Sequence, residues 1–328
     1  MAKHAYVAYR LTVSRNRQPE DALDVGNVDG KGSDLLALFH GFLRDVSTSA
    51  LRDNRYERYL NVSNLAATGR TVRFEAHHGR FGTTGQLVDT LSGVTTHEFD
   101  EDESPVSVTR NILASPSSGR WAIFLAERYG GRGAASMVLS QFKRAFRRRF
   151  DSADLLVKHE GLMDSDAWEK FIESAEMTAL EIKRFGLSSD RSHPMAEKTV
   201  GKIVTQVKPN WGEKKFPRRL RDAIIDGDVR AQELVGMPAL DADEVEAVLE
   251  DGNQQRRLLI GQAAVPILAY PIAEDRDERP ADAQVYAAME EKVSEVNGKL
   301  GLKLPYDWKA GQWSDEALSV KLDAIRDS

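Results

Sequence analysis

A short charged motif, Glu181-Ile-Lys183, has the residue types that metal-dependent cleavage of phosphodiesters requires. Two carboxylates can hold a magnesium ion, and a nearby lysine can stabilise the pentavalent phosphate or orient the attacking water. The second carboxylate would come from Asp164 or Asp166, in the order that restriction-type nucleases use. The same triplet fits an alternating, solvent-facing strand, and Glu-x-Lys is common in charged chains. Both interpretations stay open.

A glycine-rich turn at residues 130–133 stands between an apolar run, typical of a buried strand, and a helix that begins near Ala134. A helix N-terminus after such a turn presents free amide groups that can hold a phosphate. Gly131-Arg-Gly133 followed by Ser136 approximates the dinucleotide-binding fingerprint, with serine in place of the third glycine or alanine. The acidic residue that this fingerprint needs would be Glu160, which comes late. A turn that only connects strand to helix is the alternative.

Positive side chains gather in two segments. The helix that ends near Phe150 alternates apolar residues on one side with cations on the other, and residues 208–221 interleave cations with aromatic rings that can stack on bases. Arginine at this density repels itself unless it is solvated or paired with phosphates or carboxylates. The residues predicted to bind nucleic acid are Lys143, Arg144, Arg147, Arg148, Lys208, Trp211, Lys214, Lys215, Arg218 and Arg219. A solvated helix face is the alternative for the first segment.

The histidines do not form a metal site by their spacing. His77 and His78 are adjacent, so on a strand their side chains would point to opposite faces. His97 precedes the acidic run at residues 100–103, which a solvated loop also explains. No Gly-x-Ser-x-Gly elbow is present. We therefore expect no resident cofactor or metal, apart from magnesium if the chain is a nuclease.

Composition limits the class of protein. The chain has 328 residues, 41% of them hydrophobic and 29% charged, which is ordinary for a globular protein and predicts two domains. The absence of cysteine excludes disulfides, thiolate zinc sites and cysteine nucleophiles. No apolar run is long enough for a membrane span, and the N-terminus lacks a secretory signal, so we expect a cytoplasmic location. The net charge is −6, yet bases outnumber acids over residues 190–222.

Hydrophobic periodicity predicts an α+β fold, with a mixed, largely antiparallel sheet and flanking helices, followed by a smaller α+β domain. Strands are predicted at residues 5–13, 59–65, 71–77, 85–89, 95–99, 106–113, 121–126, 151–158, 178–185, 202–207, 244–249, 257–261 and 265–272. Residues 16–33 are predicted to form a loop, and helices are predicted after Asp34, at 134–150, 164–175, 214–225 and 282–298 and after Ser314. We place the domains at residues 1–187 and 188–328, because residues 188–194 have the composition of a linker.

The layout of the chain resembles a family of bacterial antiphage-defence accessory proteins, those of the Kiwa KwaB kind. The likeness rests on Phe74, Gly79 and Gly82, then on the run from Trp121 through Glu127-Arg-Tyr-Gly, then on the helix that ends at Phe150. The strand at 178–185 and the hairpin at Asp251-Gly252 extend it over most of the chain. The resemblance implies DNA binding within a defence complex, and it carries over no functional residue.

The leading prediction is a cytoplasmic, non-catalytic protein that binds nucleic acid, DNA rather than RNA, or a partner subunit in antiphage defence. One alternative is a magnesium-dependent nuclease built on Glu181, Lys183, Asp164 and Asp166. The other is a structural protein that assembles into homo-oligomers. Whether the chain is an enzyme is left open.

Overall fold

The computed structural model describes residues 4–54, 56–129, 132–162, 173–185, 202–210, 212–225, 244–250, 255–259, 269–272 and 279–326. The chain divides into two compact units, which we describe separately. Residues 2–161 and 269–328 form the sheet unit, and residues 162–268 form the insert unit together with residue 1. The boundary expected near Leu187 differs from this division, because it falls between two strands of the insert unit that pair with each other. The expectation of an α+β fold is confirmed.

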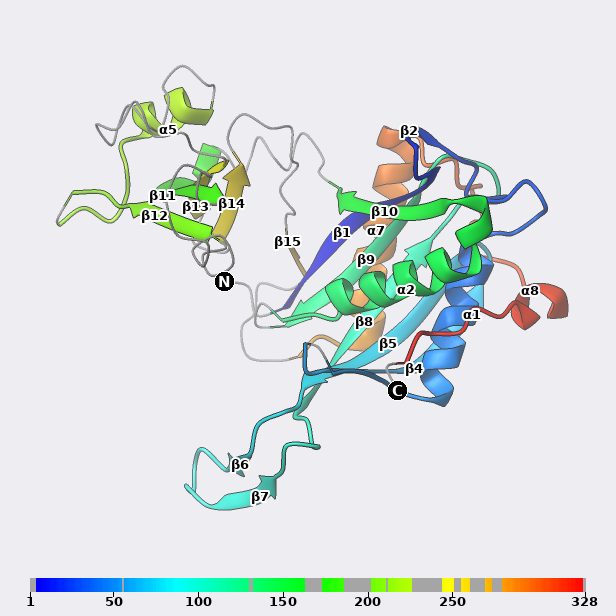
Figure 1. Ribbon diagram of the computed structural model, residues 1–328, viewed down its shortest axis with the longest axis horizontal. Helices are drawn as coiled ribbons and strands as arrows, with labels where there is room; N and C mark the ends of the chain where they lie inside the picture. The colour runs from blue at the N-terminus through cyan, green and yellow to red at the C-terminus, as the bar shows by residue number, and fades with distance from the viewer. Residues whose placement is uncertain are drawn as a thin grey trace, which may run out of the picture. The chain divides into compact units, whose positions relative to one another are not determined.

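An antiparallel sheet forms the centre of the sheet unit (Figure 1), with the order β10-β1-β9-β8-β5-β4-β3. Its strands are β1 (His4–Arg15), β3 (Leu51–Asp53), β4 (Arg58–Thr68), β5 (Thr71–Arg80), β8 (Val106–Ala114), β9 (Ala122–Tyr129) and β10 (Leu155–Gly161). Two short strands, β2 (Gln18–Ala22) and β15 (Ala269–Pro271), also pair with β1. β2 corrects the loop predicted for residues 16–33. The strand predicted from residue 151 begins as a 3₁₀ turn, η1 (Asp151–Ala153), with Asp154 left-handed at φ 52°.

Two helices, α1 (Leu35–Thr48) and α2 (Ala135–Arg149), cover one face of this sheet (Figure 1). The Asp34 side chain caps α1, which was predicted to begin after it, and accepts from the Leu36 N–H at 2.8 Å. Phe39 lies at the centre of the core, with its ring edge-on to Phe124 at 5.9 Å and to Phe142 at 4.9 Å. The apolar face of α2 is therefore packed against α1 and the sheet, which leaves its basic residues outside.

The opposite face of the sheet carries α7 (Asp282–Leu300). The apolar residues of this helix are buried. Close to its first residue, Arg110 on β8 forms a buried ion pair with the carboxylate of Glu127 on β9. Arg110 also donates to the Pro280 carbonyl and to Asp282, so it holds the start of α7. The helix extends past Gly298, where it was predicted to stop, because the left-handed residue that ends it is Gly301 at φ 64°.

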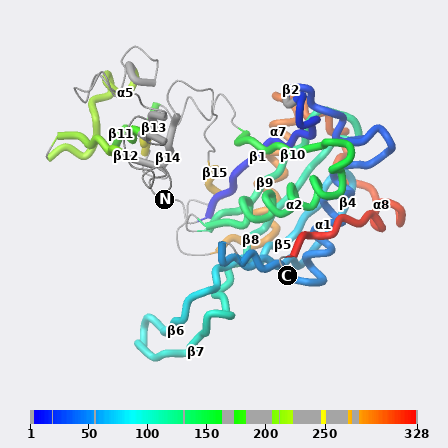
Figure 2. The backbone as a smooth tube through the Cα atoms, viewed as in Figure 1, coloured from blue at the N-terminus to red at the C-terminus, as the bar shows by residue number. Residues whose placement is uncertain are grey.

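The C-terminal segment runs beside α1, as Figure 2 shows, after the short helix α8 (Asp315–Ser319), which Ser314 caps as predicted. Arg44 donates to the Val320 carbonyl at 3.0 Å, and the Ala324 N–H donates to Asp45 at 3.0 Å. Gly41 allows this approach, because a Cβ there would lie 2.4 Å from the Val320 carbonyl oxygen.

The insert unit contains a four-stranded antiparallel sheet in the order β12-β11-β13-β14. Its elements are β11 (Glu176–Phe185), β12 (Lys202–Val207), β13 (Glu244–Glu250), β14 (Gln255–Leu259) and the helix α5 (Arg218–Ile225). β13 pairs with β14 as the hairpin prediction requires, although Asp251 and Gly252 lie outside the described residues. The helix predicted over residues 164–175 falls largely outside them as well. None of the described helices is long and apolar enough to cross a membrane.

Candidate nucleic-acid interface

The first basic surface is the outer face of α2. Val138, Phe142, Ala145 and Phe146 are fully or nearly fully buried on the inner face, at the spacing of an amphipathic helix. The cations at residues 144 and 147–149 are exposed, and Lys143 is half-buried. The three arginines of the last turn also suit the negative end of the helix dipole. The predicted division of this helix into an apolar and a basic side is confirmed.

The exposed arginines of α2 differ in what they contact. Arg144 donates to the Gln141 side chain at 3.3 Å, and Arg149 donates to the Lys321 carbonyl at 2.9 Å. Arg147 and Arg148 form no ion pair with any carboxylate of the described residues. The guanidinium groups of two consecutive residues are therefore available to an anion, as the nucleic-acid interpretation requires.

A neutral histidine lies beside this surface. His159 on β10 packs edge-on against Tyr9, with ring centroids 5.8 Å apart. Partial desolvation, and then the charge of Lys143, lower the pKa of His159 below its usual range. The positive charge near this part of α2 at neutral pH therefore comes from lysine and arginine rather than from imidazolium.

The glycine turn before α2 is explained in part by packing. Tyr129 and Arg132 exchange backbone hydrogen bonds of 2.8 and 2.9 Å, while Gly130 and Gly131 lie outside the described residues. A Cβ on Gly133 would lie 2.8 Å from the Glu127 carbonyl oxygen, so this position requires glycine. β9 and β10 each pair antiparallel with β1, which lies between them. This is not the adjacent parallel βαβ unit of a dinucleotide fold, and phosphate binding at the turn stays a prediction.

The second basic surface belongs to the insert unit. Lys208, Lys214, Lys215, Arg218 and Arg219 are all exposed there. Lys215 forms an ion pair with Glu176, whereas the other four have no ion-pair partner within the described part of the chain. Trp211, predicted to stack on bases, lies outside the described residues.

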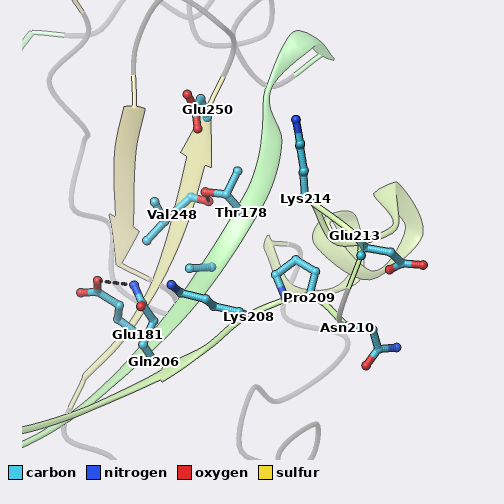
Figure 3. A pocket seen from close by; sticks show the side chains of 12 residues that line it. Thr178, Glu181, Gln206, Lys208, Pro209, Asn210, Glu213, Lys214, Val248 and Glu250 are labelled. Carbon is cyan, nitrogen blue, oxygen red and sulfur yellow. Dashed lines mark hydrogen bonds between the residues drawn. The ribbon is translucent and has the colours of Figure 1, made fainter.

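A polar cavity of about 570 Å³ opens beside this surface (Figure 3). Its lining includes the cations Lys208 and Lys214 and the exposed carboxylates Glu213 and Glu250. Glu181 also lines it, 6% exposed, and accepts a hydrogen bond from the Gln206 amide at 3.4 Å. The mixture of buried acceptor and exposed cations suits a polar ligand with both N–H donors and negative charge.

The predicted site omits Gln206 and Asn210, which also line this cavity. Their only signal in the sequence is proximity to Lys208, since polar uncharged residues have no distinctive spacing.

Comparisons with known proteins add nothing to this picture. No protein-family model matches the chain, and a search of curated proteins finds no match.

The nuclease motif is only partly described. Glu181 is on a strand as predicted, in register with Gln206 on β12, and Lys183 follows two positions later. Asp164, Asp166 and the side chain of Lys183 lie outside the described residues. Within the described ranges, no group of three or more histidine, aspartate or glutamate side chains is placed to hold a metal ion. The magnesium-dependent nuclease stays a prediction.

The histidines have separate surroundings. His77 bonds to the Ser63 hydroxyl at 2.7 Å, while burial and the nearby charge of Arg132 lower the pKa of His78. His97 pairs with Glu103 at 3.3 Å on an exposed hairpin. His77 and His78 thus have different surroundings, and the prediction that they are not joint metal ligands stays a prediction.

Proposed function

We propose that this chain binds nucleic acid, DNA rather than RNA, through the outer face of α2 and the basic segment of residues 208–219. One observation carries the proposal: Arg147 and Arg148, consecutive on α2, are both exposed and have no carboxylate partner in the described chain. The net charge of −6 opposes general attraction to a polyanion, so binding would depend on these local surfaces.

Charge reversal at α2 tests the proposal. The variant Arg147→Glu/Arg148→Glu should weaken binding to a short DNA duplex, measured by fluorescence anisotropy at several salt concentrations. Log K falls with log salt by about 0.9 per phosphate contact, so losing two contacts should make this negative slope shallower by about 2.

A matched control is Arg17→Glu/Lys31→Glu, which changes the net charge equally at two exposed positions of the sheet unit outside α2. Equal losses in both variants would show that only net charge matters, and an unchanged slope in the α2 variant would refute the site. Single-stranded DNA and RNA competitors then measure the preference for DNA.

A role in antiphage defence belongs to the same proposal and rests on the resemblance of layout. Host cells that carry the chain should lose protection against phage when Arg147 and Arg148 are replaced by glutamate. Plaque counts with the Arg17/Lys31 control measure this directly.

The nuclease alternative has its own assay. Purified chain incubated with plasmid and magnesium should leave the plasmid intact if the protein only binds. Cleavage that disappears in Glu181→Ala would replace the binding proposal with the magnesium-dependent nuclease.

A further inference from the structure

A hairpin of the sheet unit, β6 (Gly85–Val88) with β7 (Thr95–Phe99), forms a separate two-stranded sheet. Figure 1 shows it projecting from the ends of β5 and β8, and we call residues 82–103 the finger. Isolated two-stranded hairpins are only marginally stable in water, so this one gains from a partner. Four of its apolar side chains are exposed: Leu91 98%, Val94 60%, Val88 46% and Leu87 45%.

The tip of the finger is an ordered turn. The Asp89 carboxylate accepts from the N–H groups of Leu91 at 3.0 Å and Ser92 at 2.7 Å, and from the Ser92 hydroxyl at 2.9 Å. These hydrogen bonds lower the pKa of Asp89, so it is ionised at neutral pH. Gly93 supplies the left-handed residue of the turn at φ 71°. The backbone therefore holds Leu91 in the solvent.

The charge of the finger limits what it can contact. The finger contains no lysine or arginine, and its acidic residues are Asp89, Glu98, Asp100, Glu101, Asp102 and Glu103. A stem of this charge is repelled by nucleic acid and by anionic membranes. A partner surface complementary to this apolar tip and acidic stem is an apolar recess surrounded by cations.

The insert unit carries such a recess, with a volume of about 370 Å³. Its apolar lining is Met177, Phe216 and Pro217, and the Phe216 N–H donates to the Met177 carbonyl at 2.8 Å, which fixes this wall on β11. The charged residues that line it are Lys214, Lys215, Arg218 and Arg221, with Glu176 and Glu213.

Two of these cations are available to a ligand. Lys215 pairs with Glu176 and Arg221 pairs with Asp222, while Lys214 and Arg218 have no ion pair among the residues that the structure describes. The recess therefore keeps positive charge around an apolar surface that Phe216 and Pro217 present, with the fully buried Met177 behind them.

We propose that the Leu91 tip of one copy of this chain inserts into the Met177–Phe216 recess of a second copy. The two surfaces match in polarity and are opposite in charge, and they lie on different units, so each contact joins two different surfaces. Two copies that exchange fingers close a dimer, and a one-way contact builds a longer chain. Because the contact is confined to the tip of one hairpin, we expect a weak association, with a Kd on the order of 10 μM.

Sedimentation of the purified chain across this concentration range tests the proposal. Leu91→Asp should weaken association at least about tenfold, because it places a carboxylate in the apolar recess. Lys214→Glu/Arg218→Glu should do the same from the other side. Thr83→Asp is the matched control, since it adds the same charge at an exposed position of the finger away from the tip.

Mixing the two defective variants gives the decisive result. Each keeps one intact half of the contact, so a one-to-one mixture should associate where each variant alone does not. A wild-type chain that stays monomeric, association that both variants leave unchanged, or a mixture that stays monomeric would each overturn the proposal. Higher salt should also weaken association, because the contact pairs opposite charges.

The recess shares Lys214 and Arg218 with the proposed nucleic-acid interface, but Leu91 lies outside that interface. Leu91→Asp should therefore weaken self-association at least about tenfold and leave DNA binding intact. Loss of DNA binding in Arg147→Glu/Arg148→Glu should leave self-association intact, so the failure of one proposal is distinguishable from the failure of the other.

Discussion

Removing Arg110 should strongly destabilise the sheet unit. Arg110 and Glu127 are 1% and 0% exposed, and Arg110 Nε donates to the Glu127 carboxylate at 2.7 Å. The same guanidinium donates to the Pro280 carbonyl at 2.7 Å and to Asp282 at 2.9 Å. Arg110→Ala leaves a carboxylate buried without its cation and releases the start of α7.

The expected cost follows from that buried charge. Breaking a buried ion pair from one side costs about 3–5 kcal/mol in the free energy of unfolding. For a unit of this size, that corresponds to a fall in Tm of about 10 °C. Replacing both partners, as in Arg110→Met/Glu127→Gln, removes the unpaired charge, so the double variant should be the more stable of the two.

Thermal and urea unfolding followed by circular dichroism measure both variants. Limited proteolysis near residue 280 reports the release of α7, which a loss of charge alone would not cause. If Arg110→Ala lowers the unfolding free energy by less than about 1 kcal/mol, or if the double variant is less stable than the single one, the ion pair does not hold this face together.

Three further changes probe separate features. The pKa of His159 is lowered by partial desolvation and then by Lys143, so the unfolded chain binds the proton more readily than the folded chain. The free energy of unfolding should therefore keep this contribution above pH ~6.5 and lose it as the pH drops below that value. Thermal melts at several pH values should show that His159→Gln lacks this pH dependence. Gly133→Ala should cost about 1–3 kcal/mol in urea unfolding, since its Cβ meets the Glu127 carbonyl oxygen; a neutral result would show that the turn can shift. Arg44→Ala removes donors to the carbonyls of the C-terminal segment, so protease should cleave that segment faster than in the wild-type chain, with equal rates refuting the role.

Much of the sheet could be predicted because alternation is a local property. The strands around Phe74 and Phe124 and the capped start of α1 at Asp34 follow from residues within a few positions of one another. β2 could not be found in this way, because its pairing with β1 forms across an irregular register at Ser14 and Arg15. The division into units also depends on pairing between distant segments, because β15 pairs with β1 and so returns the chain to the sheet unit at residue 269.

The candidate interface shows the same limit. The basic face of α2 follows from helical spacing, but the different contacts of Arg147 and Arg149 depend on a segment far away in the chain, at Lys321. The burial of Glu181 depends likewise on packing within the insert unit, so the motif alone could not reveal it. A local pattern gives the types of side chain, while tertiary contacts decide which of them remain available.

The pairing along β1 also bears on how the chain can be cut. Gly161 pairs with Tyr9, and Ala269 pairs with Val7, on the edge of β1 that β9 does not occupy. Two strand positions span about 7 Å, so the polypeptide leaves and rejoins this edge at nearly the same place. A few glycine and serine residues are long enough to replace everything between those points. The sheet unit should therefore keep its strand pairing when a short linker replaces the insert unit between Gly161 and Ala269.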